Sequence, residues 1–268
     1  MSLLHANLAD AVLSYLRVSP ETPTAAFLDT LMSAYVRRVP WESVSRIVKR
    51  SRTADTQHCP RFAEEFWESA IMHGTGGTCF ESNYAFFALL RFLGYDGYLT
   101  INDMQTSRRC HTAILVNVEN AQWLLDAGFP IHRPLRIDGS RTTTIDTPFH
   151  TYAAQPQGSS SFEITRTRHP KPYCFTLLNQ PVSDADYREA TTRDYGADGL
   201  FLSQVIITRV VGDYIWRFTA RAGAMTLQSF NGNGLYTSHE ADDHAVMDVA
   251  QRFEMNPDLI EHALHVVA

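Results

Sequence analysis

The chain has 268 residues, enough for one large domain or two to three smaller ones with hydrophobic cores. Hydrophobic residues make up 44% and charged residues 19%, an ordinary globular composition without signs of long disorder. The net charge is −6 and no basic block is present, which argues against wholesale binding to a nucleic-acid phosphate backbone.

The first hundred residues have the pattern of four helices. Apolar residues recur at helical spacing over 3–16 and 27–36, and Pro40 breaks the pattern because the residue before proline disfavours helix. A third amphipathic helix is predicted over 60–72. The fourth is predicted from about Cys79 to Leu93, ended by Gly94.

After Gly94 the pattern changes to short strands. The segments 95–102, 111–119 and 121–129 are rich in β-branched and aromatic residues, and residues 119–120 predict a hairpin turn. Similar alternation continues over 134–208, interrupted by a short helix over 183–191, and a further antiparallel set is predicted over 203–230. A turn follows at 231–234. Asn256 and Pro257 predict the start of a C-terminal helix.

This order of elements indicates an α+β fold: helices, then an antiparallel β body, then a mixed C-terminal part. The sequence shows no internal repeat, and the segment 155–161 is the only soft candidate for a domain boundary. No window has eighteen uninterrupted apolar residues, and the beginning of the sequence lacks the pattern of a secretory signal. We therefore expect neither a membrane span nor secretion, and we expect a cytoplasmic protein.

Four cysteines are present, and they are too few for a dense disulfide framework: Cys59, Cys79, Cys110 and Cys174. Reduced thiols are the simpler interpretation. No C-x-x-C pair and no His/Cys cluster with zinc-finger spacing occurs, so we expect no metal site.

Cys79 lies where a glycine-rich loop turns into the fourth predicted helix. A helix N-terminus lowers the pKa of a cysteine thiol and so favours the nucleophilic thiolate. Thr78 and Glu81 fit a capping box. Gly76 and Gly77 would let a substrate approach the backbone N–H groups, which are candidate oxyanion donors. The alternative is that the glycines form only a turn and the cysteine fills a gap in the packing.

A base and an orienting acid are available downstream. His111 opens an apolar strand directly after a polar loop, and Asp126 ends the next strand. A hairpin around residues 119–120 would make the two side chains near neighbours across the strands. The order Cys79, His111, Asp126 then fits a catalytic triad whose acid holds the imidazole tautomer. Taken singly, the histidine could be an ordinary packed residue and the aspartate a turn residue.

Together these residues resemble the arylamine N-acetyltransferase family. The family pattern of two glycines, any residue, cysteine, any residue, glutamate and then asparagine opens a helix, and is matched by Gly76, Gly77, Cys79, Glu81 and Asn83. His111 matches the family's strand-opening histidine. The segment "DAGFP" (126–130) matches an Asp-Val-Gly-Phe-Gly motif, and "VPWES" (39–43) echoes a Pro-Phe-Glu-Asn segment.

The resemblance implies three parts around a core like that of cysteine proteases: a helical bundle over 1–94 that ends in the nucleophile helix, an antiparallel β-barrel-like domain over 95–195, and an α/β lid over 196–268. It implies acyl transfer from acetyl-coenzyme A, as a co-substrate, to an arylamine, hydrazine or related amine through a Cys79 thioester. Trp41, Gly128 and Phe129 would line the acceptor side of the cleft. The implied partners are small molecules, and the oligomeric state stays open.

The sequence departs from the family pattern at several positions. The family usually has an arginine where this chain has Thr75, and that arginine commonly pairs with the glutamate of the upstream segment, so Glu42 is expected to lack its usual partner. Trp41, Ser43 and Pro130 also differ and suggest a reshaped pocket. Two alternatives therefore stay open: an amide synthase or transglutaminase-like thiol hydrolase that uses the same triad with another acyl donor, and a non-catalytic relative that binds an aromatic ligand.

Overall fold

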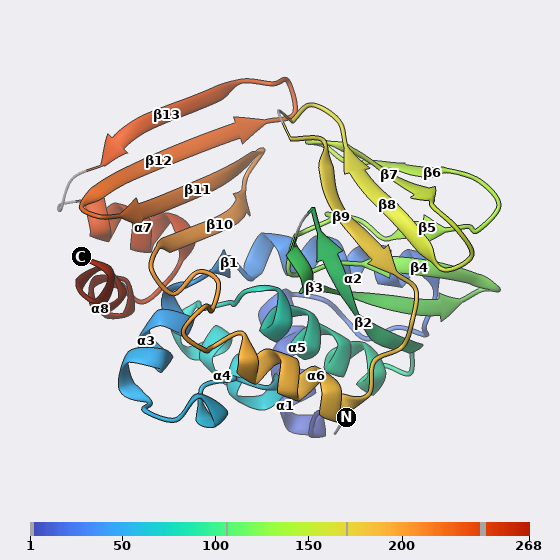
Figure 1. Cartoon of the computed structure of the whole chain (residues 1–268), viewed down its shortest axis with the longest axis horizontal. Coiled ribbons are helices and arrows are strands. Elements are labelled where there is room, and N and C mark those ends of the chain that lie inside the picture. The colour runs from blue at the N-terminus through green and yellow to red at the C-terminus, as the bar shows by residue number, and fades with distance from the viewer. Residues whose placement is uncertain (1–2, 106, 170, 242–244) are drawn as a thin grey trace.

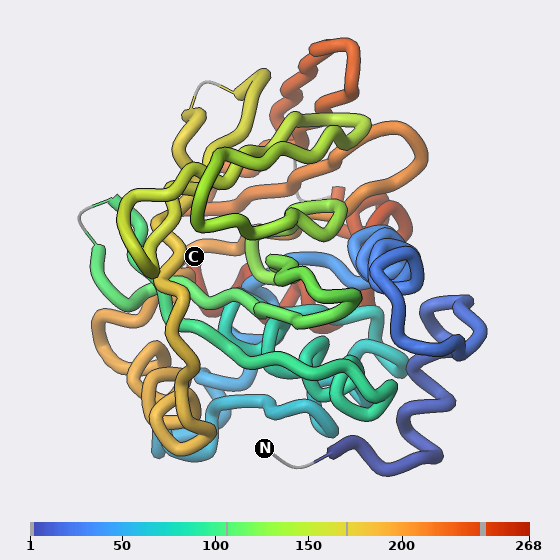
Figure 2. Tube along the Cα trace, turned by 90° about the vertical axis from the view of Figure 1, so that its right-hand side faces the viewer, coloured from blue at the N-terminus to red at the C-terminus, as the bar shows by residue number. Residues whose placement is uncertain are grey.

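The computed structural model describes residues 3–105, 107–169, 171–241 and 245–268. Most of the N-terminal helices lie in the lower part of Figure 1, with two antiparallel sheets above them, and Figure 2 shows the chain turned by 90°. The predicted α+β class is confirmed, with a helical part, a nearly closed barrel-like sheet and a second sheet with its own helices. No helix within the described residues is long and apolar enough to cross a membrane.

The N-terminal layer contains five α-helices and one 3-10 turn among the described residues: α1 (Ala6–Leu16), α2 (Ala25–Arg38), α3 (Val44–Arg52), η1 (Thr56–His58), α4 (Ala63–His73) and α5 (Cys79–Phe92). Sequence patterning predicted all except α3 and η1. Helix α3 was missed because it is short and mainly polar, with only a few apolar residues facing the core.

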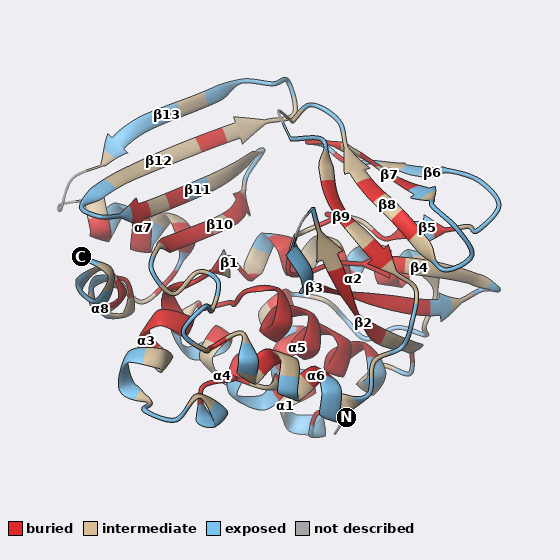
Figure 3. Ribbon diagram, in the orientation of Figure 1, coloured by how far each residue is buried: buried red, intermediate tan, exposed pale blue. Residues whose placement is uncertain are grey.

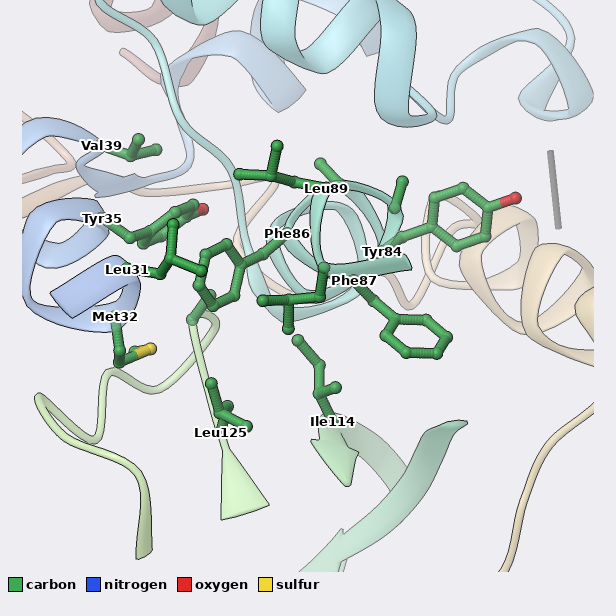
Figure 4. Close-up of a cluster of buried hydrophobic side chains, with 14 of the residues drawn as sticks. Leu31, Met32, Tyr35, Val39, Tyr84, Phe86, Phe87, Leu89, Ile114 and Leu125 are labelled. Atoms are coloured by element: carbon green, nitrogen blue, oxygen red, sulfur yellow. The ribbon is translucent and has the colours of Figure 1, made fainter. Parts of the chain in front are cut away.

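Helix α5 is the centre of the molecule, since every residue from Cys79 to Leu90 is buried (Figure 3). Its aromatic residues pack against α2 on one side, where the rings of Phe86 and Tyr35 lie 4.8 Å apart. Ile114 and Leu125 approach the helix from two strands (Figure 4). Close packing on all sides fixes the position of its first residue, Cys79.

The barrel-like sheet has eight antiparallel strands in the order β5-β4-β3-β2-β9-β8-β7-β6. They are β2 (Asp96–Met104), β3 (Ser107–Val118), β4 (Ala121–Leu125), β5 (Leu135–Ile137), β6 (Thr143–Asp146), β7 (Thr151–Pro156), β8 (Ser161–Arg166) and β9 (Tyr173–Leu178). The outermost strands β5 and β6 approach each other, where the Thr143 hydroxyl donates to the Arg136 carbonyl, so the sheet nearly closes. The segment 155–161 is the β7–β8 hairpin, so the soft boundary expected there is wrong.

The β3–β4 hairpin forms as predicted. Glu119 and Asn120 are its two turn residues and have φ angles of 53° and 56°, which is the left-handed geometry of a type I′ turn. Strand β3 starts at Ser107, so His111 lies inside the strand, and the expectation that it opens the strand is wrong. The four residues before it are polar because that end of the β2–β3 hairpin projects beyond the core.

The second sheet has the order β1-β10-β11-β12-β13, with β1 (Trp41–Glu42), β10 (Val205–Val211), β11 (Tyr214–Arg221), β12 (Ala224–Asn231) and β13 (Tyr236–Ala241). Helix α6 (Asp184–Arg193) precedes it, and α7 (Ala245–Phe253) and α8 (Pro257–Val267) follow it. Asn256 caps α8 as predicted, since its side chain accepts from the Asp258 N–H.

Strand β1 joins the N-terminal layer to this second sheet. Trp41 pairs with Thr208 of β10 and Glu42 with Ile207, and a parallel bridge connects Trp41 to Gly77. Trp41 therefore connects the glycine loop before Cys79 to the second sheet, which is called the lid sheet below. The division into 1–94, 95–195 and 196–268 stays a prediction.

Candidate active site

Cys79 is the first residue of α5, and Thr78 occupies the N-cap position as expected. The thiol sits at the positive end of the helix dipole. Cys79 is 8% exposed and faces a cavity, so its sulfur is shielded by the fold and still reachable from one side. The sulfur lies 3.8 Å from the Cys110 carbonyl oxygen of β3.

The glycine pair ahead of Cys79 serves close packing. A Cβ atom on Gly76 would lie 1.8 Å from the Pro40 carbonyl oxygen, so only glycine fits. The Gly76 N–H donates to Glu42 Oε1 at 3.0 Å. This N–H is therefore already engaged, and the expectation that Gly76 supplies an oxyanion donor is wrong.

His111 and Asp126 form a buried pair, as the hairpin register predicted. His111 Nε2 lies 2.6 Å from Asp126 Oδ2, and both side chains are almost fully inaccessible to solvent. Burial lowers the pKa of His111, but the Asp126 charge and hydrogen bonds with Asp126 and Cys79 raise it to about 10. The imidazole is thus held as an imidazolium at neutral pH.

The ring orientation assigns the two nitrogens different partners. Because Nε2 bonds to Asp126, Nδ1 is the nitrogen left to interact with Cys79. The Phe175 ring lies 4.5 Å from the imidazole, and the Phe129 ring stands edge-on at 6.2 Å. These contacts leave the imidazole little freedom to rotate.

Asp126 is held by four donors. Its Oδ2 takes the His111 bond, and its Oδ1 accepts from the N–H groups of Gly128 at 2.9 Å and Phe129 at 2.8 Å and from Asn83 Nδ2 at 3.1 Å. A carboxylate with this many donors is fixed in orientation.

Asn83 connects the acid to the nucleophile helix. Its amide also donates to the Thr112 carbonyl at 2.7 Å, and its oxygen accepts from the Ala127 N–H at 2.8 Å. The Thr112 hydroxyl in turn donates to the Cys79 carbonyl at 2.9 Å. Asn83 matches the family motif in the sequence, but no role was predicted for it; its place one turn after Cys79 on the same helix was the available signal.

A buried ion pair lies beneath the glycine loop. Arg61 Nη2 lies 2.6 Å from Glu81 Oε2 and donates to the Gly76 carbonyl at 2.7 Å. Glu81 also accepts from the Tyr195 hydroxyl at 2.6 Å. Burial raises the pKa of Glu81, but Arg61 and these hydrogen bonds hold it below its ordinary value. Thr78 makes no side-chain cap bond, so the predicted capping box is wrong: Glu81 is committed to Arg61 and Tyr195.

Arg61 also lies near Thr75, the position where the family usually has an arginine. The Thr75 hydroxyl bonds to Ser69 at 2.7 Å, and Glu42 is satisfied by the Gly76 N–H and by the N–H and hydroxyl of Ser45. The charge of Glu42 nevertheless helps to raise the pKa of Arg61. Arg61 thus supplies a cation at the glycine loop from a distant part of the chain, which the motif comparison could not detect.

The three expected acceptor residues and two of the triad residues lie around one cavity of about 910 Å³: Trp41, Gly128, Phe129, Cys79 and His111. Gly128 also packs on the nucleophile, because a Cβ atom there would lie 2.2 Å from Cys79 Cα. The Trp41 ring stands edge-on to Phe201 at 4.9 Å, on the lid side. The cavity size suits a small organic ligand.

The remaining cysteines show no second site. All four described cysteines are free thiols; Cys59 and Cys174 are buried, and Cys110 lines the cavity from β3. Within the described ranges, no group of three or more His, Cys, Asp or Glu side chains is arranged to hold a metal ion.

A model of the N-acetyltransferase family matches residues 24–258. The arylamine N-acetyltransferase / N-hydroxyarylamine O-acetyltransferase of Salmonella typhimurium is 26% identical over 247 residues, which cover 87% of this chain and 80% of that protein. The solved structure of Mycobacterium marinum arylamine N-acetyltransferase has a TM-score of 0.82 at 19% identity and covers 97% of this chain and 98% of that one.

The structure of the Mycobacterium marinum arylamine N-acetyltransferase in complex with CoA has a TM-score of 0.81 at 18% identity, with 97% and 99% of the two chains covered. At such identities the structural likeness shows the shared fold. The assignment to a family rests on the family model, which matches most of the chain. The chain belongs to the arylamine N-acetyltransferase family and is an acyltransferase enzyme.

Proposed function

We propose that the protein transfers an acetyl group from acetyl-coenzyme A to an arylamine, hydrazine or related amine by double displacement through a Cys79 thioester. Cys79 is the nucleophile, His111 the proton carrier and Asp126 the residue that orients and charges His111. The observation that carries the proposal is the buried His111–Asp126 pair at 2.6 Å, whose imidazole lines the same cavity as a thiol at a helix N-terminus.

In the first half-reaction the Cys79 thiolate attacks the thioester carbonyl carbon. The new bond joins that carbon to Sγ, the bond from the carbon to the sulfur of coenzyme A breaks, and the leaving thiolate takes a proton from the His111 imidazolium. The products are acetyl-Cys79 and free coenzyme A. The raised pKa of His111 supports this role, because the imidazole carries the proton at neutral pH.

In the second half-reaction the amine nitrogen attacks the carbonyl carbon of acetyl-Cys79. Neutral His111 accepts the proton that the amine loses, the bond to Sγ breaks, and the thiolate–imidazolium pair is restored. The Asp126 hydrogen bond keeps Nε2 protonated throughout, so that Nδ1 is the nitrogen that exchanges the proton.

Three backbone N–H groups near Cys79 already have partners and therefore do not stabilise an oxyanion. The Gly128 and Phe129 N–H groups are occupied by Asp126, and the Gly76 N–H by Glu42. The Cys79 N–H, in the first turn of α5, has no carbonyl partner within the helix. We assign this N–H and the helix dipole as the stabilising group for the tetrahedral intermediate.

Trp41, Gly128 and Phe129 are proposed to line the acceptor side of the cavity. Phe129, which follows β4, and Trp41, from the strand that pairs with β10, both offer aromatic surface to the cavity. A flat aromatic amine is the ligand class that such walls favour. The cavity volume of about 910 Å³ also leaves room for the arm of an acyl thioester.

Steady-state kinetics with acetyl-CoA and a panel of arylamines and hydrazines test the proposal. Double displacement predicts parallel double-reciprocal lines and complete loss of acetyl transfer in Cys79→Ser. Release of coenzyme A at full rate without amine would identify a thiol hydrolase, and reaction only with other acyl donors would identify an amide synthase. Absence of turnover with every donor, together with ordinary alkylation of Cys79, would indicate a non-catalytic ligand-binding protein.

A further inference from the structure

Cys79 contacts both residues that flank His111 in β3. Its sulfur lies 3.8 Å from the Cys110 carbonyl oxygen, and its own carbonyl oxygen accepts from the Thr112 hydroxyl at 2.9 Å. The first residue of the nucleophile helix is therefore connected, through its backbone, to the residue next to the catalytic imidazole.

Thr112 faces away from the cavity. Successive side chains of a strand point to opposite faces, so Thr112 points toward α5 whereas His111 lines the cavity. The Thr112 side chain is fully buried and is not among the residues that line the cavity. Its hydroxyl therefore has no direct contact with a substrate, and an effect on the reaction must pass through the residues that it contacts.

Two polar groups set the orientation of the Thr112 hydroxyl. The Asn83 amide donates to its oxygen at 3.1 Å. The Tyr187 hydroxyl, from α6, lies 3.1 Å from the same oxygen and donates to the Phe80 carbonyl at 2.8 Å. Burial raises the pKa of Tyr187 well above its ordinary value, so its hydroxyl remains a donor. Because a threonine hydroxyl has one proton and two acceptor lone pairs, these neighbours leave its proton directed at the Cys79 carbonyl.

The Thr112–Cys79 bond adds a direction that apolar packing does not supply. Packing holds α5 in the core, but hydrophobic contact is non-directional, whereas a hydrogen bond weakens steeply when its distance or angle changes. A misplacement of about 1 Å between reacting groups can cost about 100-fold in rate. A bond from the residue after His111 to the Cys79 backbone opposes such a misplacement.

We propose that Thr112 is a positioning residue of the acyl-transfer site. Its hydroxyl, oriented by Asn83 and Tyr187, holds the Cys79 backbone at the separation from β3 at which Sγ meets His111 Nδ1. This rests on the proposed function of the same site, but the geometry between thiol and imidazole can be measured with or without acyl transfer.

Three variants test the role of the hydroxyl. Thr112→Val removes it and keeps the shape of the side chain, and Thr112→Ser restores it. The matched control is Thr100→Val, which removes a fully buried hydroxyl of β2 that donates to the Ala113 carbonyl at 3.3 Å. We expect Thr112→Val to lower kcat about ten-fold or more and to change both KM values less than about two-fold, because the reacting groups are displaced and the cavity is not. Thr112→Ser and Thr100→Val should keep kcat within about three-fold of the wild type.

The titration of His111 gives a readout that a loss of stability alone would not move. Against the effect of burial, Asp126 and, after it, Cys79 raise the pKa of His111 to about 10. If Thr112→Val separates Sγ from the imidazole, NMR should find a lower pKa of His111 in this variant and the wild-type pKa in Thr112→Ser. Iodoacetamide should also alkylate Cys79 about ten-fold more slowly in Thr112→Val.

Three results would each overturn the proposal: an unchanged kcat and His111 pKa in Thr112→Val, an equal loss in Thr100→Val, or no recovery in Thr112→Ser. If wild-type Cys79 is not acetylated by acetyl-CoA, the proposed function fails. The His111 titration and the alkylation rate then decide the role of Thr112 without it, and values equal to those of the wild type refute that role.

If Thr112→Val does not fold, Tyr187→Phe carries the test, because it removes one of the two groups that orient the Thr112 hydroxyl. Its control is Tyr95→Phe, which removes a buried tyrosine hydroxyl that donates to the Thr24 carbonyl at 2.9 Å, away from the triad. A lower kcat and a lower His111 pKa in Tyr187→Phe alone support the proposal, and equal values in the two variants overturn it.

Discussion

The Arg61→Met substitution removes the cation under the glycine loop. Both side chains of the Arg61–Glu81 pair are almost fully buried. In the variant, Glu81 keeps the Arg61 backbone N–H at 2.9 Å and the Tyr195 hydroxyl at 2.6 Å, but loses its charge partner. The Gly76 carbonyl also loses a donor. The loop that positions Cys79 is therefore destabilised directly.

Breaking a buried ion pair by removing one partner costs about 3–5 kcal/mol, because the remaining charge is left uncompensated. We expect a loss in that range from urea unfolding at pH 7. The exposed pair Arg193–Glu189 provides the control, and Arg193→Met should cost less than about 1 kcal/mol. The double variant Arg61→Met/Glu81→Gln should be more stable than the sum of the two single losses predicts.

The loss should also depend on pH in a definite direction. The folded-state pKa of Glu81 lies below its ordinary value, so the pair contributes stability above the unfolded pKa of about 4.3 and loses it as pH falls through the folded pKa. Without Arg61, burial raises the pKa of Glu81, and the variant loses stability at the pH values at which the buried carboxyl ionises. The difference in the free energy of unfolding between the wild type and Arg61→Met should be large at pH 7 and small toward pH 4. A difference under about 1 kcal/mol at pH 7, additive losses of the two single variants, or a difference that does not change with pH would refute this reasoning.

Three further predictions concern the triad. Asn83→Ala removes one donor from Asp126 and should lower kcat about ten- to a hundred-fold, measured at saturating substrates; an unchanged kcat would contradict the positioning role. Gly128→Ala places a Cβ atom 2.2 Å from Cys79 Cα, so iodoacetamide should alkylate Cys79 about a hundred-fold more slowly, whereas an unchanged rate would show that the loop adapts. Asp126→Asn removes the charge that raises the pKa of His111 to about 10, and NMR titration should find that pKa lowered because burial then prevails; an unchanged pKa would argue against the pairing.

Local patterns in the sequence were sufficient for much of the fold. The apolar spacing of α5, the two turn residues of the β3–β4 hairpin and the Asn256 cap each depend on neighbours in the chain, and all form as predicted. The hairpin register also brought Asp126 to His111, because Leu125 pairs with Ile114.

Contacts between distant segments could not be predicted in the same way. The capping box was wrong because Glu81 pairs with Arg61 and Tyr195, which lie 20 and 114 residues away. Strand β1 pairs with β10, more than 160 residues later. Arg166 of β8 and Arg217 of β11 line the same cavity although they lie far apart in the sequence.

Intact-protein and peptide mass spectrometry of the enzyme mixed with acetyl-CoA, without amine, tests the central claim most directly. The account predicts the mass of one acetyl group on the peptide that contains Cys79, its removal when an arylamine is added, and no labelling of Cys79→Ser. An unmodified Cys79, or an acetyl group stably attached to another residue during turnover, would contradict it.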